Sequence, residues 1–313
     1  MILVVCPNLA VDVTVDVDSL TPGEVHRAQR ARRSAGGKGV NVARAAANLG
    51  ERALLIGLVG GGRGEEIRSL LDEENVESSL IETTGESRAC TILLEPSGTA
   101  TVINERGAKL ERDESIATSS ALVESVRDEI HDARAVALMG SLQPGLPESL
   151  YRELVTMCRN AGKFCLVDSS GAALRQTLSA GPAVVKPNRV EAEALLARRL
   201  DNDRACADAA IELRRSGAEL AVLTLGSDGV VFSRRESAAR CLSSPPVDLR
   251  YGNPTGAGDS LAAGLLVGHL RGLSDEDKVR YGVAAATASL AEGYGRFRAR
   301  DLRLDAVRIE ALD

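Results

Sequence analysis

The segment at 253–259 reads Asn-Pro-Thr-Gly-Ala-Gly-Asp and runs into a long stretch of small and apolar residues. Gly256, Ala257 and Gly258 allow a tight turn into a helix, whose first backbone N–H groups have no partner inside the helix. Such a helix start carries partial positive charge and binds anions. Asp259 would place a proton acceptor in that first turn, which is what phosphoryl transfer to a hydroxyl needs. An acidic residue also stabilises many ordinary helix starts, so these residues alone leave both interpretations open.

A second glycine-rich turn lies at 34–44, with the sequence Ser-Ala-Gly-Gly-Lys-Gly-Val-Asn-Val-Ala-Arg. It is not a P-loop, because Gly39 follows Lys38 where that motif has Ser or Thr. The turn would offer backbone N–H groups, the Lys38 ammonium and the Asn41 amide at one helix start. These groups suit a polyhydroxylated or anionic ligand. A purely structural turn is equally compatible with the spacing.

The segment at 186–191, Lys-Pro-Asn-Arg-Val-Glu, follows a short apolar run and opens a helix. Asn188 and Glu191 are three residues apart and fall on one face near the helix start. An amide oxygen and a carboxylate placed in this way could orient water around Mg²⁺, which keeps much of its hydration shell. The spacing alone favours the alternative, an N-cap with a capping-box glutamate. Residues 224–229, Thr-Leu-Gly-Ser-Asp-Gly, would form either a loop at the edge of a nucleotide site or a simple turn.

Three other kinds of site find no support in the sequence. The glycines at 57–64 follow an apolar strand and precede a helix, but their spacing does not match the GxGxxG dinucleotide fingerprint. The three histidines do not cluster with cysteines or carboxylates at metal-ligand spacing, and no Ser-His-Asp or Cys-His arrangement is indicated. Aromatic residues are 2% of the chain and the net charge of -6 is spread along it, so nucleic-acid binding has neither stacking nor electrostatic support.

The composition is typical of a globular protein of the cytoplasm. The 313 residues are 26% charged and 44% hydrophobic. Six cysteines lack paired spacing and mostly lie in apolar runs, so we expect buried thiols in a reducing compartment and not disulfides or a zinc site. The N-terminal apolar run has no basic residues before it, and no apolar run approaches the ~20 residues of a membrane span. We therefore expect a cytoplasmic protein with no membrane contact.

Short apolar runs alternate with helical patterns through most of the chain. This alternation predicts a parallel sheet that is covered by helices on both faces. The expected core strands are 2–6, 53–59, 135–139, 164–168, 183–185, 220–224 and 229–232. The expected helices are 39–48, 64–74, 147–160, 203–216, 256–271 and 275–291.

Two stretches break this rhythm and predict a second, smaller sheet. Residues 11–18 alternate strictly between Val and polar residues, which indicates a strand with one apolar and one polar face. Residues 87–95 and 99–104 predict a hairpin around the Glu-Pro-Ser-Gly turn at 95–98. The strand at 11–17, a strand at 25–31 and this hairpin would form a lid inserted in one domain that spans residues 1–313.

Taken in order, these strings resemble the signatures of the ribokinase/PfkB family of sugar kinases. AGGKGVNVARA at 35–45 is similar to the first signature, PTGAGDSLAAG at 254–264 to the second, and KPNRVE at 186–191 to the N-x-x-E motif. The resemblance covers essentially the whole chain. It is nearest to the phosphosugar branch of 1-phosphofructokinases, tagatose-6-phosphate kinases and minor 6-phosphofructokinases. GSLQPG at 140–145, VDSSGAAL at 167–174 and RYGVAAATA at 280–288 add to it.

The resemblance implies a role for each matching residue. It makes Asp259 the general base and the N–H groups of Gly256, Ala257 and Gly258 the anion hole. It implies that the sugar phosphate is held by Asp12, Gly37, Lys38, Asn41, Arg88 and Ser141. It implies that ATP lies along Lys186, Asn188, Thr224, Gly226 and Gly229, with Mg²⁺ held through water near Asn188 and Glu191. A monovalent-cation site for K⁺ would lie near Asn253, Thr255 and Gly293.

The implied fold is α/β, a ribokinase-like three-layer sandwich with a mostly parallel central sheet and a small β-sheet lid. The implied activity is ATP-dependent phosphorylation of a ketohexose phosphate. Fructose 1-phosphate, which would give fructose 1,6-bisphosphate, is expected ahead of fructose 6-phosphate and tagatose 6-phosphate. The alternatives are a kinase for an unphosphorylated sugar or nucleoside and a non-catalytic regulator that binds a sugar phosphate. Lid sheets in this family often pair between protomers, so the resemblance also implies a homodimer through the lid.

Three departures from the family pattern concern turns near the implied site. Leu9 stands where these subfamilies commonly have Pro, and Asn253 replaces a frequent acidic residue. The segment after Ala288 is one residue short against the minor 6-phosphofructokinases, which places the departure beside the implied cation ligands.

Overall fold

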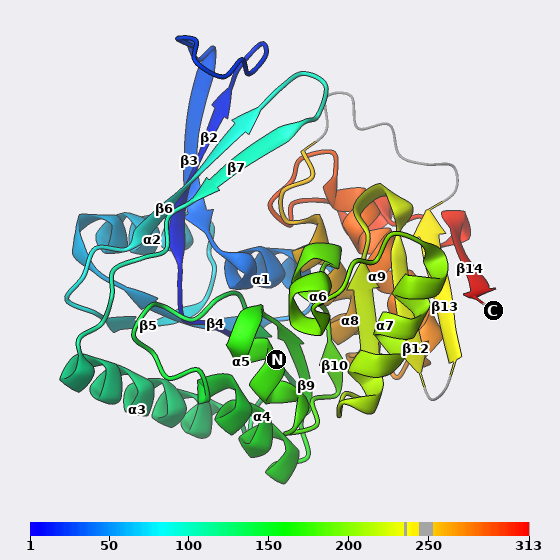
Figure 1. Cartoon of the computed structure of the whole chain (residues 1–313). Helices are drawn as coiled ribbons and strands as arrows, with labels where there is room; N and C mark the ends of the chain where they lie inside the picture. Colours follow the sequence, from blue (N-terminus) through cyan, green and yellow to red (C-terminus); the bar gives the residue numbers. More distant parts are fainter. Residues whose placement is uncertain (235–236, 244–252, 313) are drawn as a thin grey trace.

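The main body of the protein is a ten-stranded sheet. The structure is a computed structural model that describes residues 1–234, 237–243 and 253–312. Figure 1 shows the large sheet, whose strand order is β14-β13-β12-β11-β10-β9-β8-β1-β4-β5. Its strands are β1 (Ile2–Cys6), β4 (Ala53–Val59), β5 (Ser78–Glu82), β8 (Ala135–Met139), β9 (Phe164–Asp168), β10 (Val184–Val185), β11 (Leu220–Thr224), β12 (Val230–Arg234), β13 (Ser237–Ser243) and β14 (Val307–Leu312). The strands from β5 to β11 are parallel, and β12, β13 and β14 are added antiparallel.

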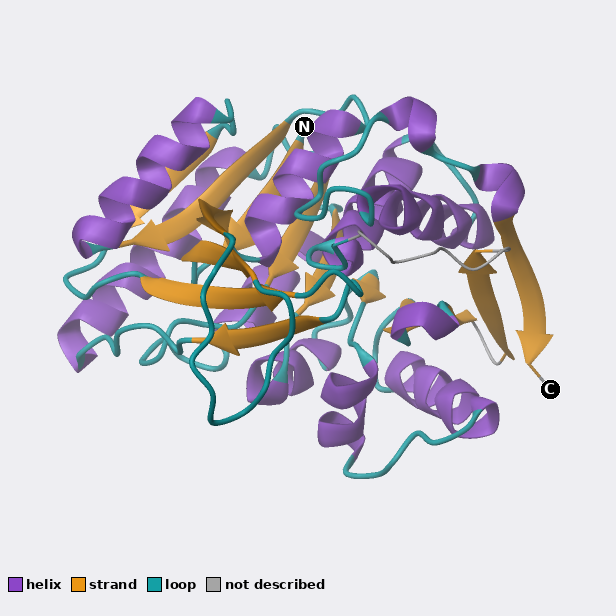
Figure 2. Ribbon diagram, turned by 90° about the horizontal axis from the view of Figure 1, so that it is seen from above, coloured by secondary structure: helices purple, strands orange, loops and turns teal. Residues whose placement is uncertain are grey.

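Helices cover both faces of this sheet, as Figure 2 shows from above. Successive side chains of a strand point to opposite faces, so Ile2 and Val4 of β1 enter one apolar core while Leu3 and Val5 enter another. On the first face lie α1 (Lys38–Asn48), α2 (Gly61–Glu73), α8 (Ala257–Leu270) and α9 (Asp275–Ser289). On the second lie α3 (Arg112–Glu129), α4 (Leu150–Asn160), α5 (Gly171–Leu178), α6 (Arg189–Leu196) and α7 (Asp203–Arg215). The expected three-layer α/β sandwich is confirmed.

The smaller sheet stands above the main body in Figure 1 and is called the lid from here on. Its strands are β2 (Ala10–Asp16), β3 (Arg30–Gly36), β6 (Arg88–Leu94) and β7 (Ala100–Asn104), in the order β3-β2-β6-β7. Asp12 pairs with Cys90 and Thr14 with Ile92. Paired residues point to the same side of a sheet, so these four side chains share one face of the lid. We call it the inner face.

The expected strand at 25–31 is wrong, because the third lid strand is Arg30–Gly36 and pairs with β2 from Asp16↔Arg30 to Ala10↔Gly36. The Arg- and Ser-rich sequence of β3 hides it, since an edge strand can keep polar side chains on both faces. Helices α3 and α5 and strands β5, β13 and β14 were also not expected. Short 3₁₀ turns lie at Gly226–Asp228, Ala299–Asp301 and Leu304–Ala306.

The structure also shows the state of the cysteines and the length and polarity of the helices. All six cysteines are free and buried. Within the described ranges, every helix is too short or too polar to cross a bilayer.

Candidate active site

The residues singled out in the sequence meet at the carboxyl ends of the parallel strands, where ligands of open α/β sheets bind. Asp168 ends β9, Lys186 directly follows β10, and Thr224 ends β11. Helix α8 starts at the same edge: a methyl group added at Gly258 would lie 3.5 Å from Nζ of Lys186. The glycine turn of α8 therefore faces a lysine from the neighbouring strand.

The turn that starts α8 depends on a left-handed glycine. Gly256 caps the helix with φ 81°, a conformation that side chains with a Cβ rarely adopt. The N–H of Ala257 is directed at the carbonyl of Pro254 at 3.2 Å, so it is partly withdrawn from the expected anion hole. Among the described residues, the N–H groups of Gly258 and Asp259 have no backbone acceptor. They are available to an anion, as the sequence predicts for Gly258.

Asp259 is buried in the first turn of α8 and its carboxylate has a defined partner. Nδ2 of Asn41, from α1, donates a hydrogen bond to Oδ2 of Asp259 over 2.8 Å. The pKa of Asp259 is raised to about 6, because burial and the negative charge of Asp168 outweigh the opposite effects of Lys38 and the Asn41 hydrogen bond. A carboxylate with this pKa is ionised near neutral pH and is still a better proton acceptor than an exposed one.

Two lysines converge on the buried carboxylate of Asp168. Nζ of Lys38 lies 2.6 Å from Oδ1, and Nζ of Lys186 lies 2.7 Å from Oδ2. Lys38 also donates to Oε1 of Glu191 over 3.1 Å. Burial alone would lower the pKa of Lys38, but the two carboxylates outweigh it and the pKa is raised. The same lysines outweigh burial at Asp168 and lower its pKa. Lys38 therefore stays charged, and Lys186 lies beside the anion hole.

Lys38, for which the resemblance implies a sugar-phosphate contact, is held by two carboxylates. Its ammonium contacts Asp168 at the end of β9 and Glu191 in α6. In the sequence, Asp168 belongs to the VDSSGAAL string at 167–174, which predicts no role for this residue. A carboxylate at the end of a fully buried strand was a signal for it, since such a group needs cationic partners.

Asp12 lies on the inner face of the lid and is buried. Its carboxylate occupies the space above Gly36, where an added Cβ would lie 2.1 Å from Oδ1. Burial raises the pKa of Asp12 to about 6, Arg44 and Arg88 lower it, and Asp259 raises it. Asp259 is close enough to raise the pKa of Asp12, so the two carboxylates lie in the same region of the protein.

Arg88, Ser141 and Gly37, for which the resemblance implies sugar-phosphate contacts, lie near Asn8 and Leu9, just before the lid strand that carries Asp12. Nε of Arg88 donates to the carbonyl of Asn8 over 3.1 Å, and Nδ2 of Asn8 donates to Oγ of Ser141 over 3.0 Å. Gly37 caps α1 with φ 111°, which turns the chain from β3 into the helix that carries Asn41. These contacts join the lid, the β8–α4 connection and α1 on one side of Asp259.

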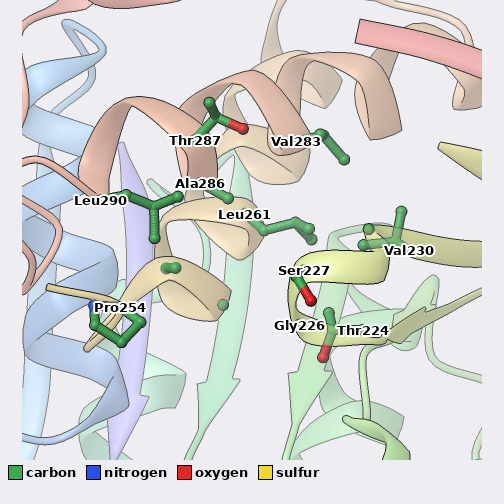
Figure 3. Close-up of a pocket in the computed structure, with 13 residues that line it drawn as sticks. Thr224, Gly226, Ser227, Val230, Pro254, Leu261, Val283, Ala286, Thr287 and Leu290 are labelled. Atoms are coloured by element: carbon green, nitrogen blue, oxygen red, sulfur yellow. The ribbon is translucent and has the colours of Figure 1, made fainter. Parts of the chain in front are cut away.

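A pocket of about 320 Å³ opens on the other side of the α8 start. Figure 3 shows it between the loop that carries Thr224, Gly226 and Ser227 and the helices α8 and α9. Ala257 and Gly258, which directly precede Asp259, also line it. The rest of the wall is mostly apolar, with Val230, Pro254, Leu261, Val283, Ala286 and Leu290. A flat, largely apolar ring system whose phosphates reach the anion hole would fit this shape.

A model of the pfkB family of carbohydrate kinases matches residues 1–299. The chain belongs to this family. It is 33% identical over 295 residues to the 1-phosphofructokinase of Xanthomonas campestris pv. campestris, and the alignment covers 92% of this chain and 91% of that protein.

Solved structures agree with the family assignment. Phosphofructokinase-2 from Escherichia coli, crystallised in complex with substrates and products, matches with a TM-score of 0.82 and 30% identity over 96% of both chains. A possible 1-phosphofructokinase from Thermotoga maritima shares the fold with a TM-score of 0.88 and 23% identity over 100% of both chains. The protein is thus a sugar kinase of the phosphofructokinase type, which transfers a phosphoryl group to an alcohol.

The N-x-x-E motif of this pfkB kinase forms the capping box that its spacing favours. Oδ1 of Asn188 accepts from the N–H of Glu191, and Oε2 of Glu191 accepts from the N–H of Asn188, each over 2.8 Å. The other Glu191 oxygen faces Lys38. Each oxygen keeps a second lone pair, so the pair fits water-mediated contact with Mg²⁺ better than direct ligation. Across the described ranges, His, Cys, Asp and Glu residues form no group of three that could hold a metal.

The three residues of the expected cation loop come together in the pfkB kinase. Oδ1 of Asn253 accepts from the N–H of Thr255 over 2.9 Å, and a Cβ at Gly293 would lie 2.6 Å from Cγ of Asn253. The carbonyl of Thr255 accepts from the N–H of Tyr294 and that of Gly293 from Arg296. Each oxygen is engaged once and keeps one lone pair, so these residues fit an oxygen-ligated cation.

Proposed function

We propose that the protein is an ATP-dependent kinase for a ketohexose phosphate, with fructose 1-phosphate as its substrate and fructose 1,6-bisphosphate as its product. The observation that carries the proposal is the position of Asp259. This buried carboxylate directly follows Ala257 and Gly258, which line the apolar pocket. It accepts a hydrogen bond from Asn41 of α1, the helix that follows lid strand β3. An acceptor hydroxyl held there would meet a base on one side and a phosphoryl donor on the other.

The reaction follows from these groups. Asp259 accepts the proton of the acceptor hydroxyl as its oxygen forms a bond to the γ-phosphorus, and the bond from that phosphorus to the β–γ bridging oxygen breaks to release ADP. The N–H groups of Gly258 and Asp259 bind the negative oxygens of the transferred group. Lys186 and Lys38 add positive charge beside them. Mg²⁺, when bound, would neutralise phosphate charge, and Asn188 and Glu191 would hold its water shell.

The substrate assignment rests on the relatives and on Arg88. The curated relative at 33% identity is a 1-phosphofructokinase, and the E. coli phosphofructokinase-2 has been crystallised with fructose-6-phosphate. Arg88 lies beside Asp12 at the lid side of the cleft, and a guanidinium binds phosphate through two parallel hydrogen bonds. A neutral sugar would leave this cation without an anionic partner from the ligand.

A coupled assay of ADP release tests the proposal. Purified protein is given ATP and Mg²⁺ with fructose 1-phosphate, fructose 6-phosphate, tagatose 6-phosphate, fructose, ribose or adenosine. We expect the highest kcat/KM with fructose 1-phosphate. A preference for another phosphorylated ketohexose would change the substrate and keep the class. A preference for a free sugar or nucleoside would overturn the phosphosugar assignment, and failure with every acceptor would favour a non-catalytic regulator.

We propose K⁺ as a second cation, bound near Asn253, Thr255 and Gly293. The support is the contact of the 253–255 loop with the 293–295 turn next to Gly256, together with a crystal structure of the E. coli phosphofructokinase-2 in complex with potassium. Activity measured in KCl and in tetramethylammonium chloride at equal ionic strength tests this assignment. Equal rates would remove K⁺ from the proposal.

We also propose a homodimer that forms through the lid. Strand β7 is an unpaired edge of the lid and carries Val102 and Ile103, both exposed apolar side chains. These neighbours lie on opposite faces of the sheet, so a partner lid could cover either. Light scattering on wild-type protein and on Ile103→Lys tests this contact. We expect a dimer for the first and a monomer for the second, and a dimer in both cases would place the interface elsewhere.

A further inference from the structure

The Gly-Tyr-Gly turn at 293–295 is held in an uncommon backbone conformation. All three residues have positive φ, with 76° at Gly293, 55° at Tyr294 and 74° at Gly295. A tyrosine with positive φ is unfavourable and persists only where surrounding contacts fix it.

The backbone of Tyr294 is packed against the anion hole. Its N–H donates to the carbonyl of Thr255 over 2.6 Å. A methyl group added at Gly256 would lie 3.0 Å from Cα of Tyr294. On the other side of the turn, Nδ2 of Asn48 in α1 donates to the carbonyl of Gly295 over 3.0 Å. The turn is therefore tied both to the start of α8 and to α1.

The side chain of Tyr294 reaches the lid. It forms a buried apolar cluster with Ala10, Cys90 and Ile92, which are lid residues. Its hydroxyl hydrogen-bonds Oγ1 of Thr14, and that bond is buried. Thr14 is two residues from Asp12 on β2, so both side chains point to the inner face.

The charge environment of the hydroxyl agrees with this position. Burial raises the pKa of Tyr294, and the negative charge of Asp12 raises it further, while hydrogen bonds to Thr14 and Asn253 act in the opposite direction. The hydroxyl stays protonated at neutral pH and can donate one hydrogen bond. It therefore lies close to the proposed sugar-binding carboxylate and to the proposed cation loop at once.

We infer that Tyr294 is a positioning residue that fixes the lid strand carrying Asp12 relative to the anion hole at the start of α8. One residue connects the two substrates' sites: its backbone touches Gly256 and Thr255, and its hydroxyl holds Thr14. The sugar phosphate would then bind to a lid that is already placed for transfer. Loss of the hydroxyl would free the lid strand and leave the nucleotide pocket intact.

Tyr294→Phe tests this role because it removes the hydroxyl and keeps the ring. A hydrogen bond of this kind changes affinity by about 3- to 10-fold. We expect KM for the sugar phosphate to rise by that factor, with KM for ATP unchanged within a factor of about 2. Thr14→Val, which removes the other partner, should give the same split. The double variant should be no worse than either single variant, since both remove one interaction.

Tyr281→Phe is the matched control. Tyr281 is also a buried tyrosine, and its hydroxyl accepts from Nη1 of Arg271 over 2.8 Å. Arg271 caps the opposite end of α8, which is a 14-residue helix and so about 20 Å long. The control loses a partly buried tyrosine hydrogen bond far from the lid, and both KM values should stay unchanged.

A second measurement does not depend on activity, so it separates this inference from the proposed function on which the kinetic test rests. Amide hydrogen exchange of the unliganded protein should be faster across β2 and β6 in Tyr294→Phe and in Thr14→Val than in wild type and in Tyr281→Phe. Exchange in β8 and β9 should not change. Unchanged exchange in the lid would overturn the inference, as would equal increases in both KM values or additive effects in the double variant. Wild-type protein without kinase activity would instead overturn the proposed function, and exchange alone would then decide the role of Tyr294.

Discussion

Asn41 donates from Nδ2 to Oδ2 of Asp259 over 2.8 Å, and its own Oδ1 accepts from Nη1 of Arg44 over 3.1 Å. Arg44 is buried and is held in turn by both oxygens of Glu74 and by the carbonyl of Ala35. An arginine can only donate hydrogen bonds, so it fixes which end of the Asn41 amide faces Asp259. The proposed base is thereby aligned by a chain of contacts that starts at the protein surface.

Asp259→Asn should lower kcat by roughly 10²- to 10⁴-fold, the usual range for loss of a general base. The amide has the shape of the carboxylate and cannot accept the proton. KM for ATP should change little, because the apolar pocket and the N–H groups of the α8 turn remain. Steady-state kinetics with the preferred sugar phosphate measures the effect. Turnover near the wild-type value would move the base to another residue.

The same substitution should stabilise the fold at neutral pH. The pKa of Asp259 is raised from 3.8 to about 6 in the folded protein, so the folded state binds more protons than the unfolded state between those values. Wild-type stability therefore falls as pH rises through this window, by about 1.4 kcal/mol for each unit of the pKa difference. The asparagine does not ionise, so Asp259→Asn should raise the free energy of unfolding by about 2–3 kcal/mol above pH 6. Urea unfolding at pH 7.5 and pH 4 should show a gain only at the higher pH, and a loss of stability at pH 7.5 would contradict the raised pKa.

The pH profile of kcat/KM should fall on the acid side of about pH 6. Asp12 and Asp259 both have a pKa near 6 and act as proton or hydrogen-bond acceptors, so protonation of either removes function. Two ionisations should make the acid side of this profile steeper than a single ionisation would. The sugar phosphate also titrates in this range, and Asp12→Asn controls for it: the substrate is unchanged, so a shallower limb in this variant belongs to Asp12. Equal slopes in the two proteins would exclude Asp12 as a titrating group.

Gly36→Ala should impair sugar binding without touching any ligand directly. The new methyl group would lie 2.1 Å from Oδ1 of Asp12, too close for any contact, so the carboxylate must move. KM for the sugar phosphate should rise by about 10-fold or more, as expected for loss of a charged hydrogen-bond acceptor. Gly62→Ala is the control, because it lies in helix α2 with open space around the added Cβ. A similar KM in both variants would mean that Asp12 does not bind the sugar.

Arg88 and Lys38 should separate recognition of the sugar phosphate from transfer of the phosphoryl group. Arg88→Ala should lower kcat/KM for a phosphorylated ketohexose by about 10- to 150-fold and leave weak activity on free fructose unchanged. Lys38→Met should lower kcat for every acceptor, because its ammonium lies beside Asp168 and Glu191. Parallel assays on fructose 1-phosphate and fructose measure both. If Lys38→Met affects only the phosphorylated acceptor, Lys38 binds the sugar phosphate after all.

The sequence by itself predicts the features that depend on residues close together in the chain. Continuous apolar runs predict β1, β4, β8 and β9 with the bounds that the structure has, because burial on both faces demands an unbroken run. The Gly-Ala-Gly turn before Asp259 predicts the helix start, and the spacing of Asn188 and Glu191 predicts their capping box. Strand β3 escapes this kind of prediction, because its pairing with β2 and not its own pattern makes it a strand.

Only the tertiary structure decides which groups share the site. Lys38 and Asp168 are 130 residues apart in the chain, and Thr14 and Tyr294 are 280 apart. The strand order places β9 beside β8 and β10, and the contact of the 293–295 turn with β2 brings Tyr294 to Thr14. The direction of the Lys38 ammonium also depends on the tertiary structure. The sequence predicts that this lysine has an anionic partner, and the buried charge of Asp168 determines which partner it contacts.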